Sequence, residues 1–342
     1  MRNFFSKLEN YFSNRIVQIA SLLGLFIGYI GDAVANKTLY WALAGVIIVL
    51  LLIAIIDEIK NYDELHTDTI HIPVIIRVDD NTDVEYVYGT LMKKIEQEYG
   101  LKNYESKLLK YRGINPKEFI FEYNGDIFEF DRLLSFAQII NYKINQTQKK
   151  LQSKVLFHIA YYRRPSVAFM LGSMLRTEGI IVYQNDDGGS TFNKVSNATT
   201  RNYKERVKVF EKYDVVQDIQ QPEQKDNLLL IINSASHDVN PNVASLQGFA
   251  NKVTATLKPQ TNGRLGSVPP TDEWSDYSSE LYTLIHDYRL EYKKITIAHA
   301  MPEAMALLVG MAIENYWNID ITQYKDGDNP YIYNMKNVHY YF

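Results

Sequence analysis

Cysteine is missing from this sequence of 342 residues, which excludes disulfides and zinc sites built on thiolates. An excess of basic residues is missing as well, because 36 Lys and Arg stand against 40 Asp and Glu and give a net charge of −4. A protein with that charge has no global field that would attract long nucleic acid, although a few local cations can still bind a small anion. The seven histidines show no spacing typical of metal ligands. We therefore expect neither a bound metal nor long nucleic acid as a partner.

The motifs of common enzymes on Rossmann-like sheets are also absent: there is no GxGxxG, no P-loop and no GxSxG. The run Asp-Asp-Gly-Gly at 186–189 is more typical of a turn than of a phosphate-binding loop. Ser236, His237 and Asp238 are adjacent in the sequence, which does not make them a catalytic triad. His299 lies on an expected strand and is more typical of a core histidine than of a base. The sequence thus predicts a protein that is not an enzyme, with an enzyme on a Rossmann-like sheet as the alternative.

The first 60 residues contain two long apolar segments. Residues 16–31 are apolar apart from Gln18 and Ser21, and the eighteen residues 39–56 include no charge. The hydrocarbon core of a bilayer, about 30 Å thick, needs about 20 apolar residues in a helix to cross it. We therefore expect two transmembrane helices, with a buried helical hairpin as the alternative. A GxxxG pattern at 24–28, which is frequent by chance, would let such helices approach closely.

The basic residues around these segments indicate their orientation. Arg2, Lys7 and Arg15 precede the first segment and Lys60 follows the second, whereas the turn between them carries Lys37 alone. Because Lys and Arg favour the cytoplasmic side, we expect both termini, and nearly all of the chain after the second segment, in the cytoplasm.

Residues 61–150 are expected to form a connector and a small α+β linker domain. The run at 71–78 predicts a strand, and the apolar spacing at 83–99 and 130–152 predicts two helices. Asn124-Gly125 between two apolar runs favours a β-hairpin.

From residue 151 short apolar strands alternate with helical segments, which predicts an α/β fold around a largely parallel sheet. Expected strands cover 154–162, 179–185, 227–236, 293–300 and 318–325, and expected helices cover 165–176, 242–257, 276–292 and 302–315. The passages HIAYYRRPSVAFMLG (158–172) and ITIAHAMPEAMALLVG (295–310) share one layout of strand, loop, proline and helix. They suggest two related halves.

The first of these passages suggests an anion site. Pro165 fits the first turn of a helix, where its missing N–H costs nothing. The start of a helix offers free N–H groups and a partial positive charge. Arg163 and Arg164 stand just before it, and arginine matches the geometry of phosphate with two donors. The alternative is a solvated loop with two surface cations.

The passages HIAYYRRPSVAFMLGSML, IIVYQN, LLLIINSASH and ITIAHAMPEAMALLVGMAI, followed by IDITQY, resemble the SAVED domain, a sensor of cyclic oligonucleotides in the bacterial anti-phage systems called CBASS. The resemblance covers about 150–342, and two apolar segments ahead of it look like the transmembrane SAVED effectors. It implies a domain order of transmembrane hairpin (1–60), linker domain (61–150) and SAVED sensor (151–342). It also implies a SAVED fold of two fused CARF-like Rossmann subdomains, with the ligand in a basic pocket between the halves.

The resemblance also implies where the ligand binds. The positions that match the loops after the family's strands are Tyr162, Arg163, Arg164, Pro165, Ser166, Gln184, Ser234, Ala235, Ser236, His237, Met301, Pro302 and Glu303. The carboxylate of Glu303 is unsuited to contact a phosphate, but it could accept a hydrogen bond from the amino group of a base.

Taken together, these features predict an anti-phage effector in the bacterial inner membrane. We expect it to use no cofactor, to bind a cyclic oligonucleotide (a cyclic trinucleotide) made by a partner CD-NTase cyclase, and to form a homo-oligomer on binding. Clustered helices would then disrupt the lipid bilayer and cause abortive infection. The alternatives are a membrane-anchored Rossmann-like enzyme, such as a nuclease that cleaves cyclic oligonucleotides, and a membrane protein that binds a protein partner.

Overall fold

The computed structural model describes most of the chain after residue 68. The described residues are 69–79, 81–151, 153–175, 179–185, 191–197, 202–259, 268–313, 317–325 and 331–335, together with Gly28, Trp41, Gly45, Ile48 and Val49. The chain forms two units, Met1–His66 and Thr67–Phe342.

The expected transmembrane segments, 16–31 and 39–56, lie outside the described residues apart from those five isolated positions, which are helical and exposed. Within the described part of the chain, no helix is both long enough and apolar enough to cross a membrane.

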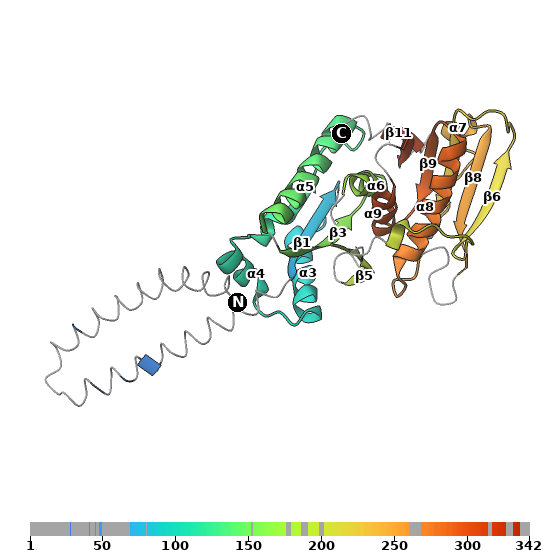
Figure 1. The fold of residues 1–342 in the computed structure, drawn as a ribbon. Coiled ribbons are helices and arrows are strands. Elements are labelled where there is room, and N and C mark those ends of the chain that lie inside the picture. Colours follow the sequence, from blue (N-terminus) through green and yellow to red (C-terminus); the bar gives the residue numbers. More distant parts are fainter. Residues whose placement is uncertain are drawn as a thin grey trace. The chain divides into compact units, whose positions relative to one another are not determined.

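The second unit contains two mixed sheets (Figure 1). Sheet A has the strand order β2-β1-β3-β4-β5. Its strands are β1 (Thr69–Val78), β2 (Ile120–Tyr123), β3 (Lys154–Tyr162), β4 (Ile180–Asn185) and β5 (Phe192–Asn197). Its helices are α3 (Val84–Glu98), α4 (Tyr104–Lys107), α5 (Phe130–Leu151) and α6 (Pro165–Met174), with short π and 3₁₀ turns at Leu108–Arg112 and Pro116–Phe119.

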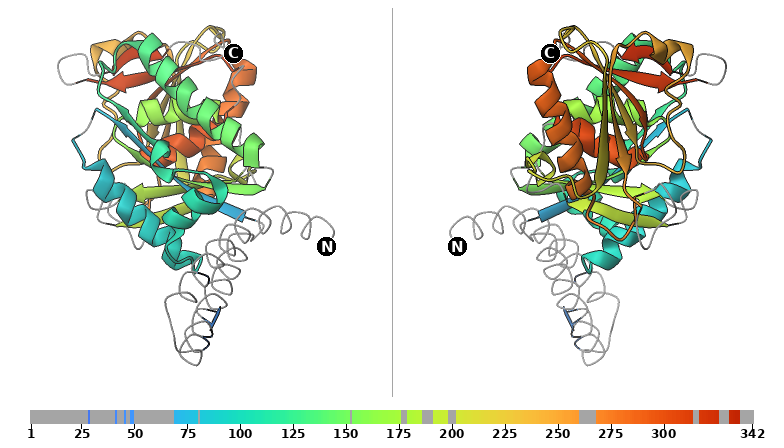
Figure 2. Two further views of the ribbon diagram at one scale, coloured as in Figure 1. Left: turned by 90° about the vertical axis from the view of Figure 1, so that its left-hand side faces the viewer. Right: turned by 90° about the vertical axis from the view of Figure 1, so that its right-hand side faces the viewer.

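Sheet B has the order β11-β10-β9-β7-β8-β6. Its strands are β6 (Tyr213–Ile219), β7 (Leu228–Asn233), β8 (Asn251–Leu257), β9 (Ile295–Ala300), β10 (Ile319–Tyr324) and β11 (Tyr331–Met335). Its helices are α7 (Ala244–Gln247), α8 (Trp274–Glu291) and α9 (Glu303–Ala312), and a 3₁₀ turn covers Asn202–Lys204. In the left-hand view of Figure 2 the helix α5, which belongs to sheet A, faces the viewer. In the right-hand view the strands β6 and β8 of sheet B face the viewer.

The two halves share one topology. In each, three neighbouring strands run parallel (β2-β1-β3 and β8-β7-β9), a fourth parallel strand follows (β4 and β10), and an antiparallel strand closes the edge (β5 and β11). The pairs β4–β5 and β10–β11 are antiparallel, and β6 is an addition to the second half. The structure thus confirms the two related halves that the sequence suggests.

The helices α6 and α9 join the halves and lie between the sheets (Figure 1). Both are apolar on all sides, as expected of a buried helix, and every residue from Ser166 to Met174 and from Ala304 to Ala312 is buried. They cross at a glycine on each side. A Cβ on Gly172 would lie 2.2 Å from the carbonyl oxygen of Leu307, and a Cβ on Gly310 would lie 2.1 Å from that of Phe169. Only glycine permits this approach of the two backbones.

The strand at 69–78 corrects the expected division of the chain. Instead of belonging to a separate linker domain at 61–150, β1 is an inner strand of sheet A, between β2 and β3, and pairs with β3 from Thr69–Lys154 to Arg77–Tyr162. The expected boundary at 150 does not divide this fold, because β1 is almost wholly buried between β2 and β3 and residues 69–151 belong to the same unit as the rest of sheet A.

Two local predictions are also wrong. The expected hairpin around Asn124-Gly125 is absent from the described residues: β2 is parallel to β1, and the chain then turns into α5. The helix expected over 242–257 is a four-residue helix followed by β8. The run NKVTATL alternates buried and half-buried residues with period two, which is the pattern of a strand.

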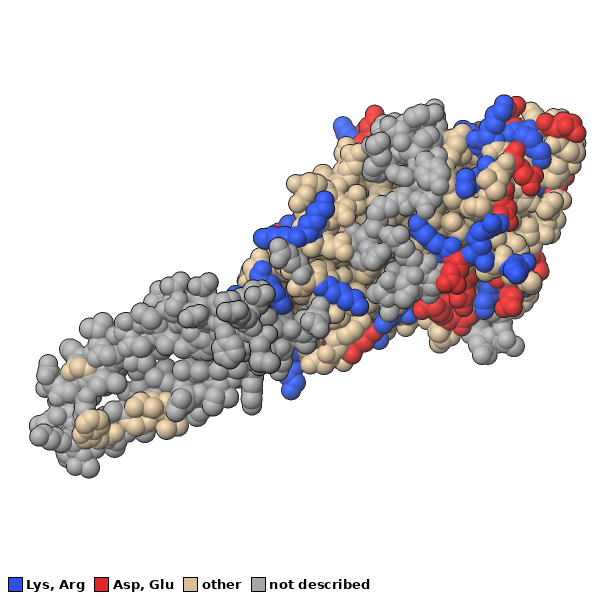
Figure 3. All heavy atoms as spheres, in the orientation of Figure 1, with Lys and Arg blue, Asp and Glu red and all other residues tan. Residues whose placement is uncertain are grey.

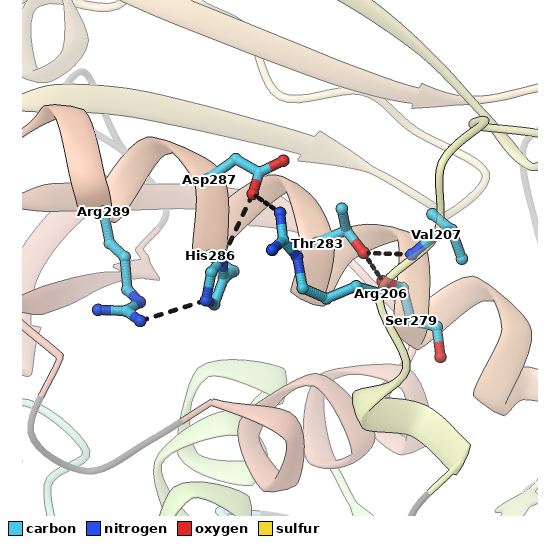
Figure 4. A network of polar contacts seen from close by, with 7 residues as sticks. All are labelled: Arg206, Val207, Ser279, Thr283, His286, Asp287 and Arg289. Atoms are coloured by element: carbon cyan, nitrogen blue, oxygen red, sulfur yellow. Dashed lines mark hydrogen bonds and ion pairs between the residues drawn. The ribbon is translucent and has the colours of Figure 1, made fainter.

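A polar network holds α8 to the segment that leads into β6 (Figure 4). The hydroxyl of Thr283 accepts a hydrogen bond of 3.0 Å from the Val207 N–H and donates to the Ser279 carbonyl, and Arg206 pairs with Asp287 at 2.5 Å. One turn away, the buried Glu280 carboxylate accepts hydrogen bonds from the backbone N–H groups of residues 211–213. These contacts fix the segment 206–213 against one face of α8.

We predict that Gly172→Ala and Gly310→Ala each lower the free energy of unfolding by about 3 kcal/mol, because a methyl group at either position overlaps a backbone carbonyl that cannot move aside. Thermal or urea unfolding of the purified chain measures this. Gly248→Ala is the matched control, since nothing lies within 4 Å of a Cβ there. Equal stability of all three variants would contradict the close crossing.

Candidate ligand-binding site

The loops that follow the strands of both halves meet around the starts of α6 and α9. In open α/β sheets, ligands bind beyond the carboxyl ends of the strands. Here the side chain of Gln184, at the end of β4, reaches the other half: its Oε1 accepts from the Ala304 N–H at 3.3 Å, and its Nε2 donates to Glu303 at 3.4 Å. In return, the hydroxyl of Ser166 at the start of α6 donates to Oε1 of Gln323 in β10. Each half therefore hydrogen-bonds to the first turn of the helix of the other half.

The two glutamines occupy equivalent positions. Gln184 is the fifth residue of β4 (IIVYQN), and Gln323 is the fifth residue of β10 (IDITQY). The equivalence extends along the helices, because Gly172 and Gly310 both stand seven residues after the first residue of their helix. The site is thus built around an approximate two-fold relation between the halves.

The first-half loop has a strained backbone. Arg163 (φ 64°) and Arg164 (φ 52°) both adopt the left-handed conformation, which is unfavourable for residues with a Cβ. The carbonyl of Arg164 accepts hydrogen bonds from the Val167 and Ala168 N–H groups at 2.9 and 3.2 Å, so this strained residue begins the helix. Arg163 is exposed. Arg164 is half-buried and forms an ion pair with Asp79, through Nε at 3.1 Å and through Nη2.

The second-half loop has the opposite charge. Met301 is buried, Pro302 precedes α9, and Glu303 begins the helix beside Gln184. Burial, and then the nearby Glu303 carboxylate, raise the pKa of Tyr161 well above its ordinary value. The candidate site is therefore cationic on one side and anionic on the other.

The other expected site residues are less central. The ring of Tyr162 is buried against Phe192, at 6.4 Å between centroids. Ser234 is also buried: its N–H donates to the Ala300 carbonyl at 2.7 Å and its hydroxyl bonds that of Tyr213 at 2.9 Å. Ala235 is half-buried, and Ser236 and His237 are exposed in the loop after β7.

Hydrogen bonds between the halves thus join Gln184 to Glu303 and Ser166 to Gln323. The other expected residues that flank them in the chain are Arg163, Arg164, Pro165, Met301 and Pro302. The buried ring of Tyr162 packs against Phe192.

The sequence analysis missed Asp79 and Gln323. Gln323 has a signal in the sequence, since it repeats the position of Gln184 in the matching strand. Asp79 follows the run HIPVIIRV, but its place beside Arg164 depends on β1 pairing with β3, which a single sequence does not reveal.

A buried chain of hydrogen bonds lies on the α3 side of sheet A. Tyr183 donates to the Glu98 carboxylate at 3.3 Å and lies 3.0 Å from Nδ1 of His158, whose Nε2 lies 2.9 Å from Nδ1 of His71. Because the tyrosine donates to Glu98, it accepts from His158, which in turn accepts from His71. Lys194 binds the other oxygen of Glu98 at 2.7 Å. Both histidines therefore donate through Nδ1 in this chain of hydrogen bonds.

The titratable side chains also limit the chemistry available. Burial lowers the pKa of His71 and of His299 to about 4, and that of His158 well below its ordinary value. Among the residues that the structure describes, no group of three or more His, Cys, Asp or Glu side chains could hold a metal ion. On the face drawn in Figure 3, acidic and basic side chains are interspersed over the described residues of the second unit.

A comparison with protein families identifies the family to which this chain belongs. A model of the SAVED family, described as the SMODS-associated and fused to various effectors sensor domain, matches residues 137–336, which is more than half of the chain. The chain belongs to the SAVED family. The match begins inside α5, so β1 and β2 complete sheet A from residues ahead of it. A comparison with curated protein sequences finds no match.

Solved SAVED/CARF-domain receptors are similar to the chain at low identity. The Cap4 receptor of Acinetobacter baumannii with the cyclic trinucleotide 3′3′3′-cAAA has 11% identity and a TM-score of 0.41, over 74% of this chain and 61% of that one. The Cap4 receptor of Moraxella osloensis has 11% identity and a TM-score of 0.38, over 76% and 61%. The chain thus spans about 60% of the length of these receptors.

We predict that the chain loses stability as the pH falls from about 6.5 to about 4. An unfolded histidine takes up a proton near pH 6.5, whereas folded His71 and His299 stay neutral down to about pH 4. The unfolded state therefore binds more protons in this window, and the free energy of unfolding falls by about 1–2 kcal/mol for each histidine between pH 7 and pH 5. Urea unfolding across this pH range measures the slope. His71→Gln should make the slope shallower, and an unchanged slope would contradict the neutral network.

Proposed function

We propose that the chain is a membrane-anchored receptor for a cyclic oligonucleotide and acts as an effector of CBASS anti-phage defence. The observation that carries this proposal is the two-sided site between the halves of a SAVED sensor. Two arginines stand at the start of α6, and a carboxylate and an amide stand at the start of α9. A cyclic oligonucleotide carries the matching groups, since its phosphates are anions and its bases carry amino and carbonyl groups.

The arrangement suits such a ligand in two ways. Arg163, Arg164 and the partial positive charge at the start of α6 favour phosphate, because arginine and helix starts both stabilise that anion. Glu303 and Gln184 favour a base edge, because a carboxylate accepts from an exocyclic amino group and an amide both donates and accepts. The expected ligand is a cyclic trinucleotide, and the receptor needs no cofactor.

Signal output is assigned to the apolar segments near the N-terminus. The bound ring would join neighbouring receptors into a homo-oligomer, and joining them raises the local concentration of their segments 16–31 and 39–56. Packed helices would then breach the bacterial inner membrane and cause abortive infection. A CD-NTase cyclase would supply the ligand.

We predict that replacing Arg163 and Arg164 together with alanine weakens ligand binding about 10- to 100-fold, because two charge-assisted contacts to phosphate are lost. Calorimetry of the purified full chain with a panel of cyclic di-, tri- and tetranucleotides measures this. The control is Arg132→Ala with Arg206→Ala, which removes the same charge from two exposed ion pairs. Undiminished affinity of the Arg163→Ala, Arg164→Ala variant would contradict the assignment of these arginines to the ligand site. Hydrolysis of the ligand by the wild-type chain would favour the nuclease alternative.

We also predict that the panel member that binds releases dye from vesicles containing the reconstituted chain, and that the Arg163→Ala, Arg164→Ala variant releases far less. Particle size measured by light scattering in detergent should rise with the same ligand. Binding without any rise in size or any release would contradict the proposed mode of action while leaving the receptor intact.

A further inference from the structure

Strained residues gather at the carboxyl ends of β1 and β3. Among the described residues, four that are not glycine have a positive φ, and three of them are Asp79 (φ 50°), Arg163 (φ 64°) and Arg164 (φ 52°). The ends of two adjacent parallel strands thus place these three residues together. Strain of this kind persists only where the surrounding structure enforces it, and it concentrates at ligand clamps and switches.

The backbones on both sides of the Asp79–Arg164 pair are fixed. The N–H of Asp79 donates to the Tyr123 carbonyl at 2.9 Å, which ties it to the end of β2. The carbonyl of Arg164 accepts from the first turn of α6 and, at 3.2 Å, from the hydroxyl of Tyr161. With both backbones held, the carboxylate meets the guanidinium in a set geometry in which Nε and Nη2 share one carboxylate oxygen.

The carboxylate of Asp79 occupies one particular edge of the Arg164 guanidinium. The Nε and Nη2 groups form an edge of the guanidinium that can bind two oxygens of a phosphate or a carboxylate side by side. Asp79 holds that edge in the structure. A ligand phosphate must either displace Asp79 or bind beside its negative charge, and both routes weaken the attraction between the site and an anion.

Stability alone does not account for the pair. The two side chains keep 35% and 46% of their surface exposed, and exposed ion pairs contribute little to folding. Three left-handed residues are unfavourable for folding, so this local arrangement costs more than a surface ion pair returns.

We infer that Asp79 is the affinity-setting residue of the ligand site: it occupies the phosphate-binding edge of Arg164 until a nucleotide phosphate replaces it. This inference rests on the proposed function, since it concerns the same site and a phosphodiester ligand. Asp79 holds the guanidinium of Arg164 in place and competes with the ligand phosphate for it. Asp79 need not contact the nucleotide itself.

The test is Asp79→Asn in the full chain, titrated with the same panel of cyclic di-, tri- and tetranucleotides. Asparagine tolerates the left-handed conformation, so the backbone is preserved while the charge is removed. We expect affinity for the panel member that binds wild type to rise about three- to tenfold at low salt. The gain should shrink as salt increases, because salt screens the exposed carboxylate. Asp79→Gly, which is free to adopt a positive φ, should show the same gain if the asparagine variant folds poorly.

Two controls make the result specific. Asp226→Asn removes an equal charge from an exposed ion pair with Lys293, ahead of β7 at the opposite end of that strand from Ser234, and should leave affinity unchanged. In an Arg164→Gln background, Asp79→Asn should raise affinity less than twofold, because the two effects act through one guanidinium. Equal or weaker binding by Asp79→Asn overturns the inference and leaves the receptor function standing. Failure of wild type to bind any panel member overturns the receptor function, and the inference with it.

Discussion

The close crossing of α6 and α9 is the constraint on which the rest of the molecule depends. Each helix presents a glycine to a backbone carbonyl of the other, at a separation that no Cβ could occupy. Because both helices begin at the carboxyl end of a central strand, a crossing fixed at this distance also fixes the distance between the two loops. The contacts of Gln184 with the start of α9 and of Ser166 with Gln323 follow from it.

Two halves with one topology have diverged where they meet the candidate ligand. Residues that set the shape of the crossing stay equivalent, namely the glycines and the two glutamines. Residues that set charge do not: the first half offers Arg163 and Arg164, whereas the second has Met301 and Pro302 at the matching places and the carboxylate of Glu303 directly after them. A symmetrical frame with unlike loops suits a ligand whose parts alternate between anionic links and neutral rings.

Much of the fold could be predicted from local patterns. The strands at 154–162 and 295–300 are continuous apolar runs, and the prolines after them mark helix starts, so both were visible in the sequence. The role of β1 was not visible, because its partner β3 lies beyond three α-helices and a further strand, and pairing at that distance leaves no local trace. The strand at 251–257 was predicted as part of a helix, because a short run without strong turn signals is compatible with both a strand and a helix.

The candidate site was predictable in its loops but not in its contacts. The apolar-to-proline passages pointed to Arg163, Arg164 and Glu303, whereas their partners are 85 residues away for Arg164 and 119 for Glu303. Side chains that meet across such separations are brought together by the helix crossing and by strand order. Neither follows from the spacing of residues along one chain.

The position of β1 has a mechanical consequence. This strand is the first described element after the apolar segments, and it is hydrogen-bonded on both sides, to β2 and to β3. A force applied along β1 would load its two ladders in shear, so that many bonds share the load instead of breaking one after another. The strand that opens sheet A in the sequence is thus also one of its inner strands, and it resists being peeled from the sheet.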